Sequence, residues 1–558
     1  MAASKLKEVF LHLSQHSVDS VQNGKSFTEW DDYMHVDRPI ESKLYAKMDE
    51  IDVEGGGIVL LIGSAGDGKS HLLSRVRQMS DWGDCSFYND ATASCSPKKT
   101  AIDTLKEALI DFKDTNIYST ESKLVLAVNL GMLNALIDDA EFNAEYKEIV
   151  NATSPIFEDN NTSHSKETNR VKVVMFVDQQ IFEFDADATD KDKVVDSLFL
   201  SSIMEKIVSK DKKNPFYKAY LDDMANGVSL KDPLVLNYLL LSIPEVRQSI
   251  VKTIIEAVVR FKMVITPREF LDFLYSIMVY PYEYEYKEKK DFFEALLPSL
   301  FYCGTENLIQ KAVAKLDPLK YSSTEHDRQL SVLFTSYSIP ANYFNDGQRA
   351  MLPTELIKRT NEFYANNGRD IERTTKFVFR LKHLLCYHTE SEVYASYIEI
   401  LKGIYKENVH KMQEIYTIVA KAIPRHYGSY YDKANMIPLN IQGGRYRLYG
   451  NLQLKPKPIH PFYSEKEHNE FSLRFDMSWQ LPDSQVSLRM DFQLYSYLYE
   501  LNRGKLALSY ENEKDMKFGR FIRQLVRKCD CEQEVTVVRT DLPEIKLTES
   551  SFGNIELS

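Results

Sequence analysis

The chain has 558 residues, of which 44% are hydrophobic and 27% charged, a composition typical of globular proteins with several domains. Its formal net charge of -12 excludes a protein whose whole surface attracts nucleic acid, so any DNA contact would need a local basic patch or a partner. No apolar run reaches the ~20 residues that cross a bilayer, no signal peptide is recognisable and the six cysteines are scattered, which predicts a protein of the reducing cytoplasm with no membrane partner.

The first fifty residues predict an N-terminal helical segment. Apolar residues recur at helical spacing over residues 5–13, which indicates a short amphipathic helix. Residues 33–38 are predicted to be extended, and Pro39 favours the first turn of a second helix that runs to about residue 51. This second segment could border a bound base or could simply cover the edge of a sheet.

The next stretch predicts a P-loop. An apolar run over residues 58–62 leads into a glycine-rich loop that fits the pattern G-x-x-x-x-G-K-[ST], and a helical pattern follows it. The loop consists of Gly63, Ser64, Ala65, Gly66, Asp67, Gly68, Lys69 and Ser70. Glycines let successive backbone N–H groups approach phosphate oxygens, and the helix adds its N-terminal partial charge.

The residues of this loop are predicted to divide the work of binding ATP and Mg²⁺. Lys69 should contact the β- and γ-phosphates, and the Ser70 hydroxyl should ligand Mg²⁺. The neighbouring His71 is included in the predicted nucleotide site. GTP stays open because no base-reading motif is visible, and the alternative to the whole assignment is a strand-to-helix turn that binds no ligand.

Residues 51–190 alternate between strand and helix patterns and predict an α/β P-loop NTPase core with a parallel sheet. The strand patterns after the loop are 85–88, 124–128 and 171–177, the helical patterns are 100–112 and 141–149, and 151–170 reads as a polar insertion. Because the carboxyl ends of parallel strands meet at one edge of a sheet, the polar residues that close these strands become candidates for the site.

Asp178 closes the strand pattern 171–177 and is predicted to hold Mg²⁺ and to act in catalysis; a turn-capping acid is the alternative. Gln179 stands where a catalytic glutamate would be expected, so the water-activating group is missing from this motif. Asn129, which closes 124–128, would suit a residue that senses the γ-phosphate. Asp90 could organise a loop or a water molecule, although an Asn-Asp turn is the simpler interpretation.

From residue 191 the pattern becomes helical, which predicts a helical lid over 191–280 and a further helical domain over 281–434. Thr266 and Pro267 predict the start of one lid helix. Arg268, at that start, could contact the phosphates as charge develops, or could be an ordinary surface arginine.

Residues 435–558 predict a mixed α+β domain. The expected strands are 436–441, 445–448, 471–475, 486–492 and 535–538, and the expected helices are 494–503 and 518–528. One face of the last helix carries four cations, which are Lys517, Arg520, Arg523 and Arg527. This basic stripe could contact DNA or a partner protein, and a solvated helix face is the alternative.

Segments spread over most of the chain together resemble the family of DNA phosphorothioation-dependent restriction proteins DptF, also called DndF. The matching segments are Leu-x-x-Ser with Gly24, His35-Val36-Asp37-Arg38-Pro39-Ile40-Glu41, the loop extended through His71-Leu72-Leu73, Tyr88-Asn89-Asp90-Ala91-Thr92, Lys99-Thr100-Ala101-Ile102-Asp103-Thr104-Leu105, Asn129-Leu130-Gly131, Thr266-Pro267-Arg268-Glu269 and Asp491-Phe492-Gln493-Leu494-Tyr495. The resemblance implies the nucleotide-binding subunit of a bacterial defence complex that has two further subunits and restricts DNA lacking a backbone sulfur mark.

Three functions are therefore weighed. The first is an ATP-binding and ATP-hydrolysing subunit of the restriction complex, which meets DNA through that complex. The second is a nucleotide-binding scaffold or switch with negligible turnover, and the third is the nuclease itself. A homo-oligomer is an open alternative to a single copy.

Overall fold

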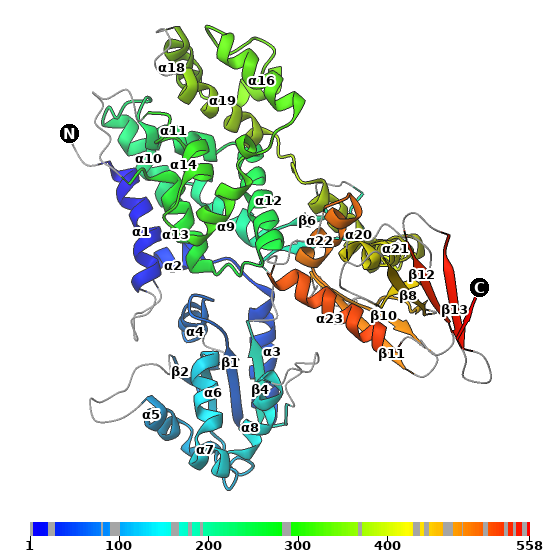
Figure 1. Ribbon diagram of the computed structural model, residues 1–558. Helices are drawn as coiled ribbons and strands as arrows, with labels where there is room; N and C mark the ends of the chain where they lie inside the picture. The colour runs from blue at the N-terminus through cyan, green and yellow to red at the C-terminus, as the bar shows by residue number, and fades with distance from the viewer. Residues whose placement is uncertain are drawn as a thin grey trace. The chain divides into compact units, whose positions relative to one another are not determined.

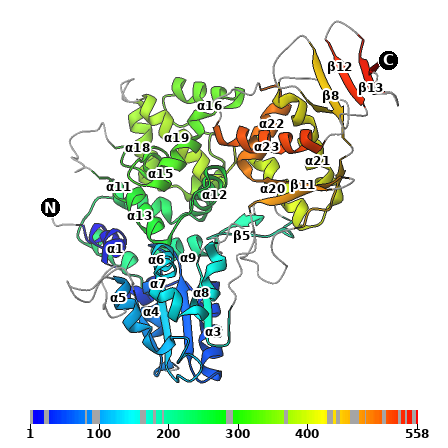
Figure 2. The same ribbon diagram turned by 60° about the horizontal axis from the view of Figure 1, so that its bottom comes forward.

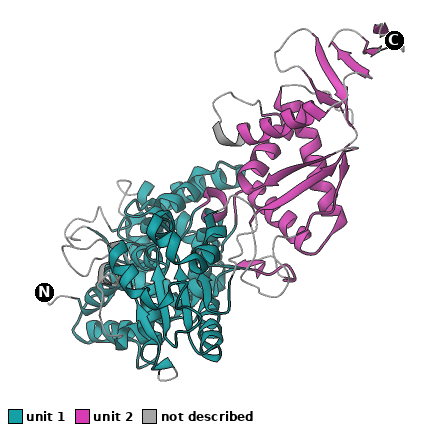
Figure 3. Cartoon of the chain, turned by 90° about the horizontal axis from the view of Figure 1, so that it is seen from below, with its two compact units in different colours: residues 1–183, 196–257, 263–388 teal, residues 184–195, 258–262, 389–558 magenta. Residues whose placement is uncertain are grey.

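The computed structural model describes residues 4–19, 28–79, 82–89, 101–157, 167–176, 181–189, 193–281, 292–365, 371–427, 436–439, 446–452, 454–460, 473–481, 484–505, 512–528, 534–539, 543–549 and 555–558. The chain divides into two compact units, which Figure 3 colours separately. Unit 1 comprises residues 1–183, 196–257 and 263–388, and unit 2 comprises 184–195, 258–262 and 389–558. Each unit is thus built from three stretches of chain.

A parallel β-sheet forms the centre of one part of unit 1. Its strands lie in the order β2-β3-β1-β4 and are β1 (Gly57–Ile62), β2 (Ser86–Tyr88), β3 (Lys123–Val128) and β4 (Val171–Met175). All pairings are parallel, and Ile62 lies opposite both Val128 and Met175, so the three longer strands end together. The parallel α/β core predicted from the alternating strand and helix patterns is confirmed.

Helices cover both faces of this sheet, as Figure 1 and the turned view in Figure 2 show. One face packs against α3 (Pro39–Val53) and α4 (Lys69–Val76), and the other against α5 (Ala101–Ala108), α6 (Leu130–Asp138), α7 (Ala140–Glu145) and α8 (Lys147–Thr153). Val59 and Leu61 of β1 point to the first layer, whereas Ile58 and Leu60 point to the second. Burial on both faces explains why β1 is apolar at every position after its glycine.

The rest of unit 1 is helical. Its helices are α1 (Lys5–Asp19), α2 (Glu29–Met34), α9 (Leu198–Val208), α10 (Pro215–Ala225), α11 (Pro233–Leu241), α12 (Pro244–Phe261), which continues into unit 2, α13 (Pro267–Met278), α14 (Leu297–Cys303), α15 (Leu308–Val313), α16 (Thr324–Thr335), α17 (Asp346–Met351), α18 (Thr354–Ala365) and α19 (Ile371–Leu385). Proline in the first turn fixes several starts, and the caps of α10, α11 and α13 are Asn214, Asp232 and Thr266. No helix among the described residues is long and apolar enough to span a bilayer.

Unit 2 combines helices with antiparallel sheets. The helices are α20 (Glu392–Tyr405), α21 (Val409–His426), α22 (Phe492–Asn502) and α23 (Asn512–Lys528). One sheet contains β9 (Lys455–Pro456), β10 (Phe475–Gln480) and β11 (Gln485–Met490), and the other contains β7 (Met436–Pro438), β8 (Arg447–Asn451), β12 (Glu534–Val538), β13 (Ile545–Glu549) and β14 (Ile555–Leu557). The short pair β5 (Glu183–Phe184) and β6 (Val195–Asp196) flanks the first stretch of unit 2. The predicted mixture of helices and strands is observed.

Several predicted elements have different bounds, and two show why. In place of one helix over 141–149 there are two, because Tyr146 leaves the helical conformation at φ -127 and ψ 46, and the carboxylate of Asp114 accepts hydrogen bonds from the first backbone N–H groups of α8. The strand predicted over 471–475 instead runs from Phe475 to Gln480, because its register follows antiparallel pairing with β11.

Candidate functional site

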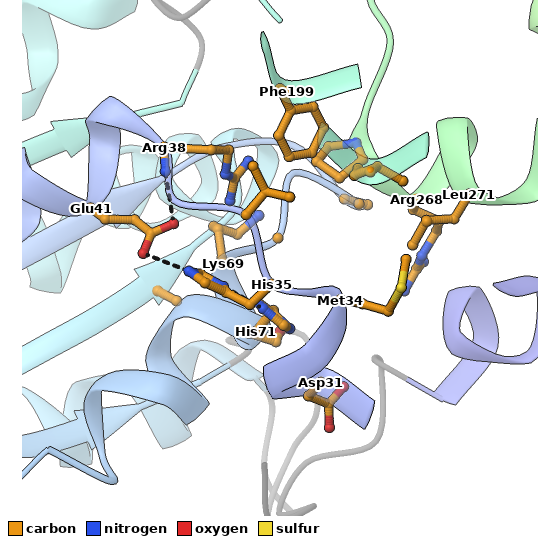
Figure 4. Close-up of a pocket in the computed structure, with 18 of the residues that line it drawn as sticks. Asp31, Met34, His35, Arg38, Glu41, Lys69, His71, Phe199, Arg268 and Leu271 are labelled. Carbon is orange, nitrogen blue, oxygen red and sulfur yellow. Dashed lines mark hydrogen bonds and ion pairs between the residues drawn. The ribbon is translucent and has the colours of Figure 1, made fainter. Parts of the chain in front are cut away.

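A cavity of about 290 Å³ lies in unit 1 at the carboxyl ends of β1 and β3. Figure 4 shows side chains that line it, and the labelled ones come from α2, the segment between α2 and α3, α3, α4, α9 and α13. Part of the lining is apolar, and this apolar lining includes Leu13, Trp30, Met34, Phe199, Ile203 and Leu271. The remaining wall carries the backbone and polar side chains of the loop.

The glycines of the loop stand where a side chain would not fit. Gly66 and Gly68 have φ of 89° and 93°, in the left-handed region that favours glycine. A Cβ at Gly68 would lie 2.8 Å from Arg38 Nη2, and a Cβ at Gly63 would lie 2.6 Å from Asp67 Oδ2. Helix α4 begins directly after Gly68, so its N-terminus and the adjacent loop N–H groups lie at the cavity.

Lys69 folds back over this loop. Its Nζ donates hydrogen bonds to Gly63 O at 3.0 Å and to Ser64 O at 2.6 Å. The carboxylate of Asp67 accepts a hydrogen bond from the backbone N–H of Ser64, and burial raises the pKa of Asp67. Side chains of the loop therefore hydrogen-bond to its own backbone, and the ammonium group of Lys69 lies at the cavity.

Two oxygen atoms meet beside the loop. The Ser70 hydroxyl donates to Asn89 Oδ1 at 3.0 Å, and both residues line the cavity. Asn129 also lines it, but its amide oxygen accepts from Met132 N at 2.8 Å as the cap of α6, which leaves the amide nitrogen as its available donor.

The predicted site residues are distributed as follows. The cavity lining includes Ala65, Gly66, Gly68, Lys69, Ser70, His71, Asn129 and Arg268. Gly63, Ser64 and Asp67 complete the same loop. Arg268 reaches the cavity because Thr266 and Glu269 form a capping box that fixes the start of α13. Asp178 and Asp90 lie outside the described residues, and the basic stripe on α23 belongs to unit 2.

Arg38 is a site residue for which sequence reasoning gave no role. Its Nη1 donates to Asp67 O at 2.8 Å, and its guanidinium lies over the rings of Phe176 at 5.1 Å and Phe199 at 5.7 Å. Burial lowers the pKa of Arg38. The sequence signal was the run from His35 to Glu41 directly before a proline-started helix, but no local pattern pairs an arginine with a loop 29 residues away.

Glu41 holds the same segment from the side of α3. It is buried, its Oε1 accepts from Arg38 N at 3.1 Å, and its Oε2 lies 3.2 Å from His35 Nε2. Burial raises the pKa of Glu41 to about 7, against an ordinary value of 4.5. The folded chain therefore holds a proton at Glu41 over a pH range in which the unfolded chain has lost it.

This shift predicts a pH-dependent loss of stability. Because the pKa is higher in the folded state, stability falls as pH rises from 4.5 to about 7 and does not change further above that. Glu41→Gln removes the titration, so the variant should gain about 2 kcal/mol relative to the parent between pH 5 and 8. Urea midpoints at these two pH values measure the gain, with Glu29→Gln on the exposed start of α2 as the control. A difference that stays constant with pH would contradict the prediction.

Comparison with family models, with curated proteins and with solved structures found no match to this chain. The site offers backbone N–H groups at a helix N-terminus, a lysine on the loop, a pair of side-chain oxygen atoms and an apolar recess. This set suits an anion that continues into a less polar group.

Proposed function

We propose that unit 1 binds ATP with Mg²⁺ at the glycine-rich loop and hydrolyses it. The observation that carries this proposal is the loop itself, in which Gly66 and Gly68 have positive φ, α4 starts at Lys69 and the whole follows a buried parallel strand. Phosphate oxygens would take the place of Gly63 O and Ser64 O as partners of the Lys69 ammonium group. This is the arrangement expected of a P-loop.

The residues present also fit the cofactors. Mg²⁺ prefers oxygen ligands, and the Ser70 hydroxyl lies 3.0 Å from a second oxygen, Asn89 Oδ1. Asp178, three residues after the end of β4, is the acid that we propose as a further ligand. The apolar lining suits the base, and Arg268 on α13 is proposed to contact the phosphates.

We further propose that the chain is the nucleotide-binding subunit of a complex that restricts DNA lacking the sulfur mark. The support is the sequence resemblance, together with a net charge of -12 that favours DNA contact through partners or one patch over contact through the whole surface. A nucleotide switch with negligible turnover is the second candidate. It is favoured by Gln179, which stands where a catalytic glutamate would be expected.

Steady-state phosphate release by the purified chain distinguishes these two functions. We expect Mg²⁺-dependent release that rises when unmodified DNA and the partner proteins are added, because the missing water-activating group must come from elsewhere in the assembly. Labelled-ATP binding is measured in the same samples. Binding without release in any mixture would favour the switch, and absence of binding would contradict both functions.

A further inference from the structure

Two histidine rings join the segment between α2 and α3 to helix α4. His35 Nδ1 lies 3.0 Å from His71 Nε2, and the rings stack with 12° between their planes. On its other side His35 Nε2 lies 3.0 Å from Asp37 Oδ1 and 3.2 Å from Glu41 Oε2. The His35 side chain is only 7% exposed, so these contacts are made largely away from water.

The direction of each hydrogen bond in this series follows from which groups can donate and which can accept. The carboxylate of Asp37 only accepts hydrogen bonds, so His35 carries its hydrogen on Nε2. In the neutral ring Nδ1 is then an acceptor, and His71 must donate from Nε2. A side chain at position 71 that keeps a donor can therefore preserve the link, whereas alanine at either position breaks it.

The link connects the two parts of the candidate site. His35 follows Met34, which belongs to the apolar lining, and His71 follows Ser70 in the first turn of α4. Other contacts run in parallel, from Arg38 Nη1 to Asp67 O, and from Arg75 Nη1 to Asp37 Oδ1 at 3.2 Å and to Glu41 Oε2 at 3.9 Å. Asp37 is 84% exposed, so its ion pair is weakened by solvent, and the Arg38 contact reaches only the loop backbone. The histidine pair is thus a short, part-buried side-chain connection to α4.

We propose that His35 is a positioning residue that acts through His71 to fix the phosphate-binding loop relative to the apolar lining. The inference rests on the proposed nucleotide site and adds the requirement that one ligand must reach both parts at once. ATP spans the loop and the lining, whereas inorganic tripolyphosphate needs only the loop. A residue that sets the spacing between them matters for ATP and not for tripolyphosphate.

Binding of the two probes to the full chain tests the proposal. His35→Ala and His71→Ala should each weaken ATP about five- to tenfold, the scale of one lost hydrogen bond, and change tripolyphosphate binding less than about twofold. The double variant should bind ATP no more weakly than the single variants, because both remove the same link. His71→Gln, which keeps a donor, should restore ATP affinity to within about threefold of the parent. His388→Ala, an exposed histidine of unit 1, is the matched control.

Several outcomes would overturn the inference. Equal losses of affinity for both probes would show a structural or electrostatic role. Additive losses in the double variant would show that the two rings act independently. Unchanged ATP affinity would show that the link does not fix the spacing between the loop and the apolar lining. Lys69→Ala separates these results from failure of the proposed function. If the parent binds ATP and Lys69→Ala does not, the nucleotide site stands and only the positioning role is in question.

Discussion

Lys69→Ala should reduce ATP affinity about 100-fold or more, because it removes the only lysine of the loop from a site that binds several phosphate charges. The fold should survive, since the Lys69 side chain contacts loop carbonyls and belongs to no apolar core. Titration of labelled ATP and the thermal unfolding midpoint measure the two effects on the same preparation.

The matched control is Lys147→Ala, which removes an exposed lysine at the start of α8 and changes the net charge equally. We expect it to bind ATP like the parent. If Lys69→Ala also bound ATP with the affinity of the parent, the loop would not bind phosphate. The proposed function would then lose the observation on which it rests.

The second large effect is expected on α23. Phe518, Phe521, Ile522 and Leu525 are buried on one face of this helix, and the four residues of the basic stripe are exposed on the other. Lys517 Nζ lies 3.3 Å from Asp491 Oδ2, which also lies 2.9 Å from Lys262 Nζ, so its charge is partly compensated. Within the described part of the chain, the three arginines of the stripe form no ion pair, which makes them the better candidates for a phosphate backbone.

Reversing Arg520 and Arg523 to Glu should weaken DNA association of the assembled complex about tenfold or more at low salt. The slope of log affinity against log salt should fall by about 2, because two phosphate contacts are lost. Basal ATP turnover should not change. Fluorescence anisotropy with labelled duplex over a salt series gives both quantities.

Lys212→Glu together with Lys213→Glu is the control for net charge, since both lysines are exposed in a loop of unit 1. This pair should lower the affinity slightly and leave the slope unchanged. If the α23 variant kept the parent's slope, the stripe would be a solvated face or a protein contact, and DNA would be held by another subunit.

Local patterns were enough to predict the sheet and the loop, and not enough to predict how the cavity is closed. The run before Gly63 predicted β1 because a strand buried on both faces must be apolar. Thr266 and Pro267 predicted the start of α13 because capping depends on neighbours in sequence. Arg38 and Asp67 are far apart in the chain, and their contact depends on packing that no spacing encodes.

Strand bounds in unit 2 likewise depend on partners that are distant in the sequence. The strand predicted over 486–492 ends at Met490, because Asp491 turns the chain and caps α22 with its Oδ1 on Leu494 N at 2.9 Å. An aspartate after an apolar alternation reads equally well as the end of a strand or the start of a helix. The pairing partner decides between them, and a single sequence does not show it.

The composition of unit 2 affects how shortened versions of this protein should be interpreted. Its first stretch, residues 184–195, follows soon after β4 of unit 1 in the sequence. In this stretch Phe184 packs on Tyr405, and Ala188 O accepts a hydrogen bond from Lys402 Nζ at 2.9 Å. A fragment that begins at Thr389 lacks this stretch, and one that stops at His388 keeps the stretch without its partners. Neither cut follows a boundary of folding. Lost activity in such a truncation would report a damaged unit 2, so functions are better mapped to the units by point substitutions in the full chain.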